Sequence, residues 1–186
     1  MSDGTNVFTY PRILANSSTA AQSSTFATDT YITNSNIAPP AAADIKAKGQ
    51  YHCVFDMTKT NVGTATPIIT VRFGVNGTTA DAAVLQWTLG AGTAAVDTAV
   101  IEIWATFRSV GPSTSAVLQG TLKILHTAAT GTGLTSTADK ALTPFAVTTS
   151  AGFATTPSGG YIGVSFNGGS SFSGTVQQVQ ATLIQP

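Results

Sequence analysis

Charged side chains are scarce in this 186-residue chain. Only 9% of its residues are Asp, Glu, Lys or Arg, and the eight acidic and eight basic side chains cancel, whereas an average soluble domain is about 25% charged. A nucleic-acid-binding domain usually has a basic stripe and a pI above about 9, but this sequence has a pI near 6.7. We therefore expect no nucleic-acid partner. A weakly charged surface suits either a protein packed against other proteins or a secreted β protein.

Cysteine is also rare, and long apolar runs and targeting signals are missing. Cys53 is the only cysteine, so no intrachain disulfide can form, and its place in the alternating run 51–57 predicts a buried side chain. No apolar stretch approaches the roughly 20 residues that cross a bilayer. Residues 1–6 lack the basic start and apolar run of a signal peptide. We therefore expect no membrane partner and synthesis in the cytoplasm.

Groups for catalysis or metal binding are few. The chain has two histidines, His52 and His126, and one glutamate, Glu102. It has no His-x-His, Cys-x-x-Cys or EF-hand pattern. His52 and Asp56 share one face of a predicted strand, but with so many serines in the chain a Ser-His-Asp triad has no specific support. We predict a protein that is not an enzyme, with no catalytic residue, no cofactor and no metal.

Short segments with β-strand character make up most of the chain. They are rich in Val, Ile, Thr and aromatic residues and are separated by Gly, Asn, Pro and Ser clusters. No segment convincingly predicts a helix, and no linker divides the chain. The predicted strands lie at 26–33, 49–58, 67–75, 83–89, 98–108, 115–126, 143–150, 160–166 and 175–184.

This number of strands without helices is typical of an all-β, antiparallel β-sandwich or barrel. The Cys-Trp-Cys pattern of immunoglobulin domains is absent. Strands of eight to ten residues with several long connections favour a jelly roll over a barrel of tight hairpins. We predict one jelly-roll domain over residues 26–186, preceded by an extended N-terminal arm over residues 1–25.

The predicted arm is rich in Ser, Thr, Ala and Asn but contains several large apolar side chains. These are candidate interface residues: Phe8, Tyr10, Ile13 and Leu14. Large apolar side chains are not expected in a segment that serves only as a flexible linker. Two interpretations stay open: the arm docks on a neighbouring subunit, or it forms an intramolecular edge strand or a partly disordered tail.

Trp104 is the remaining interface candidate. In the strand at 101–108 it shares a face with Glu102, Thr106 and Arg108, while the alternate residues are apolar and predict core contacts. A large aromatic side chain on a nominal solvent face is a candidate contact with a partner. The alternative is that Trp104 is buried beneath the arm or a long loop.

The C-terminal stretch contains two strand-like runs, 159–166 and 175–185, on either side of Asn167-Gly168-Gly169. An Asn-Gly turn predicts a closing hairpin, and Val176 falls out of phase, which predicts a bend near Gln177. This stretch resembles virion structural proteins of tailed bacteriophages. The resemblance lies in the sequence Gly-Gly-Tyr-Ile-Gly-Val-Ser-Phe-Asn-Gly-Gly and in Thr-Val-Gln-Gln-Val-Gln-Ala, which follows it. The resemblance is to small capsid decoration (cement) or tail-associated β-sandwich proteins.

The resemblance implies a structural protein of the virion, located on the capsid surface. We expect a homotrimer that binds the major capsid protein and stabilises the assembled lattice. The alternative is a receptor- or carbohydrate-binding module of a tail fibre or spike. Its candidate stacking residues are Tyr31, Trp87, Trp104 and Tyr161, although Trp87 lies in an apolar run that predicts core.

Overall fold

The structure is a computed structural model that describes residues 11–18, 20–39, 45–126, 134, 145–155 and 160–186. These residues contain no helix and form twelve strands. The strands are β1 (Arg12–Ser18), β2 (Gln22–Ser24), β3 (Thr30–Tyr31), β4 (Gln50–Lys59), β5 (Ile68–Gly74), β6 (Ala82–Thr88), β7 (Asp97–Ser109), β8 (Val117–His126), β9 (Phe145–Thr149), β10 (Tyr161–Asn167), β11 (Gly174–Val176) and β12 (Val179–Gln185).

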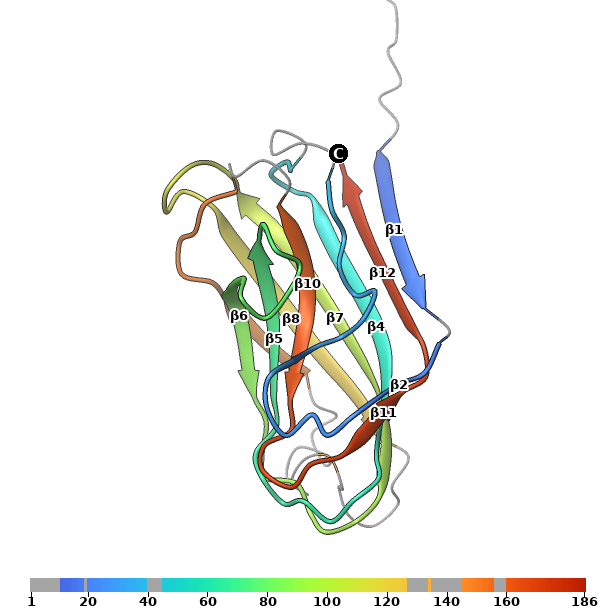
Figure 1. Ribbon diagram of the computed structural model, residues 1–186. Helices are drawn as coiled ribbons and strands as arrows, with labels where there is room; N and C mark the ends of the chain where they lie inside the picture. Colours follow the sequence, from blue (N-terminus) through green and yellow to red (C-terminus); the bar gives the residue numbers. More distant parts are fainter. Residues whose placement is uncertain (1–10, 19, 40–44, 127–133, 135–144, 156–159) are drawn as a thin grey trace, which may run out of the picture.

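The strands form two antiparallel sheets that pack face to face (Figure 1). The larger sheet has the order β1-β12-β4-β7-β8-β9, with β2 and β11 paired at the end of β4. The smaller sheet has the order β3-β10-β5-β6. The first strand therefore lies beside the last, and the chain passes back and forth between the sheets. This is the wrapping of a jelly roll, with β8 and β9 added to one sheet, and the predicted fold is confirmed.

The core lies between the two sheets and is formed by every second side chain along each of the central strands. In β4, Tyr51, Cys53, Phe55 and Met57 are fully buried. Burial raises the pKa of the Cys53 thiol to about 12, as expected for a thiol without access to water. The facing strands complete the core with Ile101, Ile103 and Phe107 from β7 and with Ile69, Val71, Ile162, Val164 and Phe166 from β5 and β10.

The predicted closing hairpin is wrong. β10 belongs to the smaller sheet and β12 to the larger one, so the turn at Gly168 and Gly169 carries the chain across the sandwich. The side chain of Phe172 is buried in this crossing and packs on Phe166, with ring centroids 5.2 Å apart. A buried aromatic residue in the connection favours a crossing over a tight hairpin, because it needs both sheets to cover it.

The predicted bend near Gln177 is confirmed. β11 ends at Val176 and β12 begins at Val179. The Asp56 carboxylate accepts hydrogen bonds from the backbone N–H groups of Gln177 (2.9 Å) and Gln178 (2.8 Å). These two donors have left the β ladder at this point, and Asp56 supplies their partner.

Part of the predicted arm lies within the sandwich. β1 pairs with β12 over seven residue pairs, and β2 pairs with β11. Residues 12–18 are therefore an edge strand of the larger sheet, which is one of the two interpretations left open for this segment. The boundary predicted between residues 25 and 26 falls after β2. Residues 1–10 lie outside the described residues.

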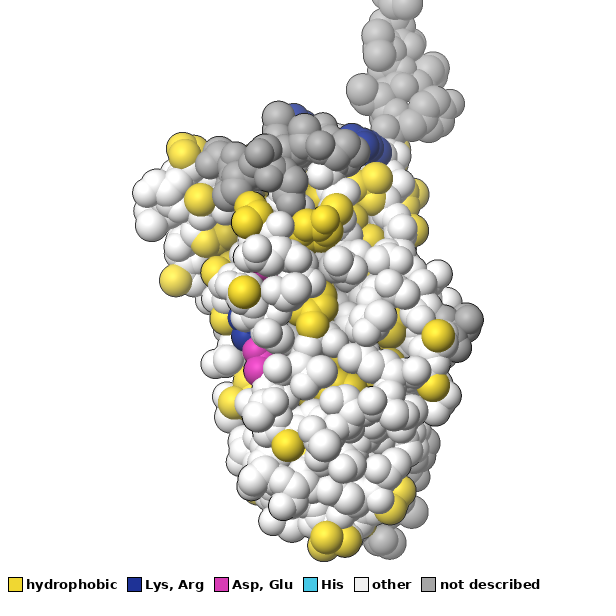
Figure 2. Space-filling view, in the orientation of Figure 1, with side chains coloured by type: hydrophobic (Ala, Val, Ile, Leu, Met, Phe, Trp, Pro, Cys, Tyr) yellow, Lys and Arg dark blue, Asp and Glu magenta, His cyan; other side chains and the backbone are white. Residues whose placement is uncertain are grey.

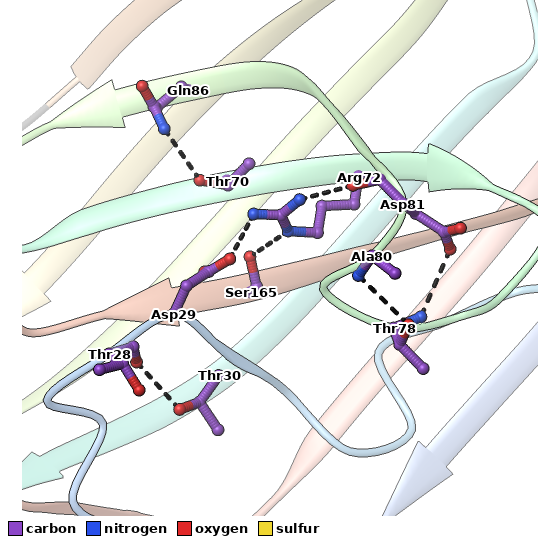
Figure 3. A network of polar contacts seen from close by, with 10 residues as sticks. All are labelled: Thr28, Asp29, Thr30, Thr70, Arg72, Thr78, Ala80, Asp81, Gln86 and Ser165. Atoms are coloured by element: carbon purple, nitrogen blue, oxygen red, sulfur yellow. Dashed lines mark hydrogen bonds and ion pairs between the residues drawn. The ribbon is translucent and has the colours of Figure 1, made fainter.

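The segment that follows β2 covers the outer side of the smaller sheet. Arg72 of β5 donates hydrogen bonds to Ser165 Oγ (2.8 Å) and to the backbone carbonyl of Asp81 (2.5 Å), and it forms an ion pair with the Asp29 carboxylate (Figure 3). Ser165 is fully buried although it points away from the core. The chain thus covers part of one outer face itself, whereas none of the described segments covers the outer face of the larger sheet.

Candidate interaction surface

The most extended open surface in the described part of the chain is the outer face of the larger sheet, formed by the outward side chains of β1, β12, β4, β7, β8 and β9. Alternation along each strand produces it: in β7 every second residue from Asp97 to Phe107 is buried, while Val100 and Trp104 are exposed. The strand register places six outward residues in a single row across its centre: Ala15, Thr182, His52, Trp104, Thr121 and Val147.

A stacked aromatic pair lies at the centre of the outer face. The rings of His52 and Trp104 are nearly parallel, at 14°, with centroids 3.7 Å apart. Both rings bind the same carboxylate oxygen: Glu102 Oε1 lies 3.0 Å from His52 Nε2 and 3.0 Å from Trp104 Nε1. Because an ionised carboxylate only accepts hydrogen bonds, His52 carries a proton on Nε2. Shared contacts of this kind hold Trp104 in one orientation while 41% of the residue stays exposed.

The charges near Trp104 compensate one another. Lys123 Nζ lies 3.9 Å from Glu102 Oε2, on the side away from the rings. The pKa of Glu102 is lowered mainly by its hydrogen bond from His52; desolvation opposes this shift, and the Trp104 hydrogen bond and the nearby positive charges add to it. The centre of the outer face therefore presents an aromatic ring with little net charge, which a partner can cover at a low desolvation cost.

Exposed apolar side chains concentrate on the outer face. Five of the eight large hydrophobic residues that are exposed among the described residues point from it: Ile13, Val100, Trp104, Leu125 and Val147. The other three, Val62, Val75 and Val96, lie in connections. Figure 2 shows the molecule from the side of the smaller sheet, where charged side chains are rare too. Exposed apolar side chains on a weakly charged sheet make this face a candidate site of protein contact.

The structure separates the predicted interface residues. Ile13 of β1 points from the outer face and is 61% exposed, and Trp104 lies on the same face with β12 and β4 between them. Leu14 points to the other side of β1 and packs against the core. Phe8 and Tyr10 lie outside the described residues. Trp104 is 41% exposed, and β1, the described part of the arm, does not lie over it. Residues 1–10 and most of the long connection after β8, which the alternative would place over Trp104, lie outside the described residues.

The sequence analysis did not identify His52, Glu102 and Lys123 as neighbours of Trp104. These residues come from three strands, and only the pairing of β4 with β7 and of β7 with β8 brings them together. The alternation in the sequence indicates which side chains point outward, but it says nothing about which strands are adjacent.

The candidate stacking residues for a carbohydrate do not gather on one surface. Trp87 is in the core, as predicted, with 5% of its surface exposed. The Tyr31 hydroxyl is buried in the segment that covers the smaller sheet. Tyr161 begins β10 of that sheet, on the other side of the molecule from Trp104. One face of the Trp104 ring is occupied by His52.

The polar groups considered for catalysis serve the fold where the structure describes them. His52 is paired with Glu102 and not with Asp56, which binds the backbone of residues 177 and 178. His126 Nδ1 lies 2.7 Å from Asp97 Oδ2 in the interior, and the same oxygen accepts a hydrogen bond from the backbone N–H of Leu134. Within the described ranges, no three His, Cys, Asp or Glu residues are grouped as a metal site requires. No helix long and apolar enough to cross a membrane is found there either.

No family model matches the sequence, and no curated protein matches it. Among solved structures, the chain is similar to the CBM2 module of the evolved Dit protein of Lactobacillus casei BL23 phage J-1, with 14% identity and a TM-score of 0.36 over 81% of this chain and 69% of that one. It is similar to peanut lectin, with 10% identity and a TM-score of 0.41 over 94% and 99% of the two chains. A chain from infectious bursal disease virus (Gt strain) shows 12% identity and a TM-score of 0.30, over 94% of this chain and 33% of that one. At TM-scores this low, these likenesses carry no argument about function.

Proposed function

We propose that this protein is a non-enzymatic structural protein of a virion, and specifically a capsid decoration protein. In this proposal three copies bind the assembled lattice of the major capsid protein on the capsid surface and stabilise it. The observation that supports the proposal is the outer face of the larger sheet, which carries both a fixed tryptophan and several other exposed apolar side chains. The low charge of the whole chain and the resemblance of its C-terminal stretch to phage virion proteins agree with it.

The outer face is large enough for a stable interface. Six neighbouring strands span about 24 Å, and the ten residues of β4 extend about 33 Å. The product, about 800 Å², equals the area that each partner contributes to a protein–protein interface of standard size. A sheet face of this area can cover a broad protein surface such as a shell built from repeated subunits.

The proposed mechanism is preferential binding to one state of the shell. A protein that binds the assembled, expanded shell and not its precursor stabilises the expanded state by the difference in binding free energy. Three linked copies that engage three equivalent sites bind more tightly than one copy, because the second and third contacts become intramolecular. Many trimers on a shell add their contributions.

Co-sedimentation with shells tests this proposal. The purified full-length chain is mixed with expanded shells, with unexpanded shells and with no shells, and the pelleted fraction is measured. We expect saturable binding to expanded shells only. Val100→Asp places a charge on the outer face, four residues along β7 from Trp104, and should abolish binding. Val75→Asp is the matched control, because Val75 is also exposed but lies in a connection. Equal binding of both variants, or no binding of the natural chain, would refute the proposal.

A carbohydrate-binding module is the second candidate function. It is favoured by one observation: the exposed indole of Trp104 lies beside the Glu102 carboxylate, and such a pair suits a sugar ring with its hydroxyl groups. A glycan array with the natural chain and Trp104→Ala distinguishes the candidates. Specific glycan binding that is lost in Trp104→Ala would favour this function over capsid binding.

A further inference from the structure

The free edge of the larger sheet is formed by β1. Figure 1 shows β12 on one side of β1 and no described strand on the other. β1 pairs with β12 over seven consecutive residues without a bulge, and no lysine or proline interrupts it from Ile13 to Ser18. Natural sheets usually protect such an edge with charge, proline, a bulge or a short strand. The other edges are shorter or irregular: β3 has two residues, β9 has five, and the pairing of β6 contains a register shift.

Backbone groups of β1 point outward from this edge. The Ser17 N–H donates to the Asn16 side chain (2.9 Å) and is therefore turned away from β12. Since main-chain groups alternate along a strand, those of Ile13, Ala15 and Ser17 face the free edge. Ala15 and Ser17 are exposed. An added strand can pair with the outward N–H groups of Ile13 and Ala15 and with the outward carbonyl groups of this row, whereas the Ser17 N–H already donates to Asn16.

Two hollows flank β1, one on each side of the sheet. The inner hollow, about 240 Å³, opens between the two sheets and is lined by Leu14, Asn16, Asn36, Ile37 and Tyr161. The outer hollow, about 440 Å³, lies over Ala15, Ser17, Gln180 and Thr182, where side chains are small or polar. Side chains of an added strand alternate between the two faces of a sheet, so they would point alternately into the two hollows.

We infer that this edge receives residues 5–10 of a second copy of the chain as an additional strand. The segment Thr5-Asn6-Val7-Phe8-Thr9-Tyr10 is uncharged and rich in strand-forming residues. Alternation places Phe8 and Tyr10 on one side and Val7 and Thr9 on the other. The aromatic side faces the inner hollow, where Leu14 and Ile37 offer apolar contact and the two asparagines offer partners for a hydroxyl group.

Pro11 is the reason that the donor is a second copy. To pair with β1 of its own chain, the segment would have to reverse direction between Tyr10 and Arg12. A hairpin turn that tight needs residues with positive φ, usually Gly or Asn, whereas Pro11 fixes φ near −65° and keeps the preceding residue extended. The segment therefore leads away from its own edge. Each copy gives one strand and receives one, and three copies related by a three-fold axis close such a ring.

This inference concerns self-association and does not depend on capsid binding. The first measurement is the mass of the full-length chain by light scattering, where strand exchange predicts a defined multiple of 18.9 kDa. Ala15→Pro removes one outward N–H from the edge, a position at which sheets tolerate proline, and should yield a monomer. Ala15→Thr keeps the N–H and should still assemble. The double variant Phe8→Ser, Tyr10→Ser changes no residue of the described strands and should also be monomeric.

Mixing the two monomeric variants is the decisive step. The proline variant keeps an intact donor segment, and the serine variant keeps an intact edge, so an equimolar mixture should form a heterodimer of twice 18.9 kDa. Docking of the segment on its own chain predicts no association in the mixture. That result would overturn the inference, as would a natural chain that stays monomeric or an oligomer that neither variant disturbs. Shell binding by a monomeric chain would leave the proposed capsid binding standing, but without the trimer and without strand exchange.

Discussion

Replacement of Trp104 by alanine should weaken shell binding about 60-fold. A tryptophan side chain presents about 250 Å², and 41% of Trp104 is exposed, so docking removes about 100 Å² from water. At about 25 cal/mol per Å² this burial stabilises the complex by about 2.5 kcal/mol per copy, which corresponds to about a 60-fold change in Kd. Three linked contacts in a trimer would enlarge the observed effect.

The same variant should fold almost normally. It loses the stack on His52 and the hydrogen bond to Glu102, together worth about 1–2 kcal/mol at a partly exposed site. Trp104→Phe keeps an aromatic ring over His52 and serves as the matched control. Affinity is measured by titrating labelled protein onto expanded shells, and stability by thermal unfolding. An unchanged Kd for Trp104→Ala on shells that bind the natural chain would refute the argument that this tryptophan is buried on docking.

Three further predictions concern the fold. Gly120→Ala should destabilise the domain by about 1–3 kcal/mol, because its new Cβ would lie 2.9 Å from the ring of the buried Trp87; an unchanged unfolding midpoint in urea would contradict this packing. Asp56→Ala should cost about 1–2 kcal/mol, because two backbone donors at residues 177 and 178 lose their partner; Asp56→Asn, which keeps an acceptor, should cost less in the same assay. The pKa of Glu102 is lowered from 4.5 by folding, so its contribution to stability is present above pH 4.5 and is lost as the pH falls through the lowered value; Glu102→Gln should therefore flatten the stability curve on the acid side, and a curve of unchanged slope there would argue against the His52 and Trp104 contacts.

The longer strands of the core could be predicted from the sequence because each has a buried face. β1 and β2, which have no fully buried side chain, lie in the segment predicted as an arm, and only Thr30–Tyr31 of the strand predicted at 26–33 is formed. In β4 and β7 strict alternation of core and surface residues identifies both the strand and its outward side, which is how Trp104 was recognised. Cys53 was placed in the core for the same reason, and Trp87 because it lies in an apolar run. Local periodicity was therefore enough to predict the positions of the longer strands, the fold class and one residue of the candidate surface, Trp104.

Strand adjacency could not be predicted in the same way. The Asn-Gly turn after β10 has the local chemistry of a hairpin, yet the demand to bury Phe172 between the sheets sends the chain across the sandwich. β1 lies beside β12 although most of the chain separates them. The contacts of Trp104 with His52 and Lys123 depend on the same long-range pairing. Which strands become neighbours is determined by the packing of the whole domain, so it cannot be predicted from a short stretch of sequence.

Oxidative footprinting of the two tryptophans, with and without expanded shells, tests the central claim most directly. In the free protein, hydroxyl radicals should modify the exposed Trp104 and spare the buried Trp87. If the outer face of the larger sheet binds the shell, saturation with shells should protect Trp104 while the exposed Val62 and Val75 in the connections stay reactive. Modification of Trp104 at its free rate on saturated shells would contradict the claim.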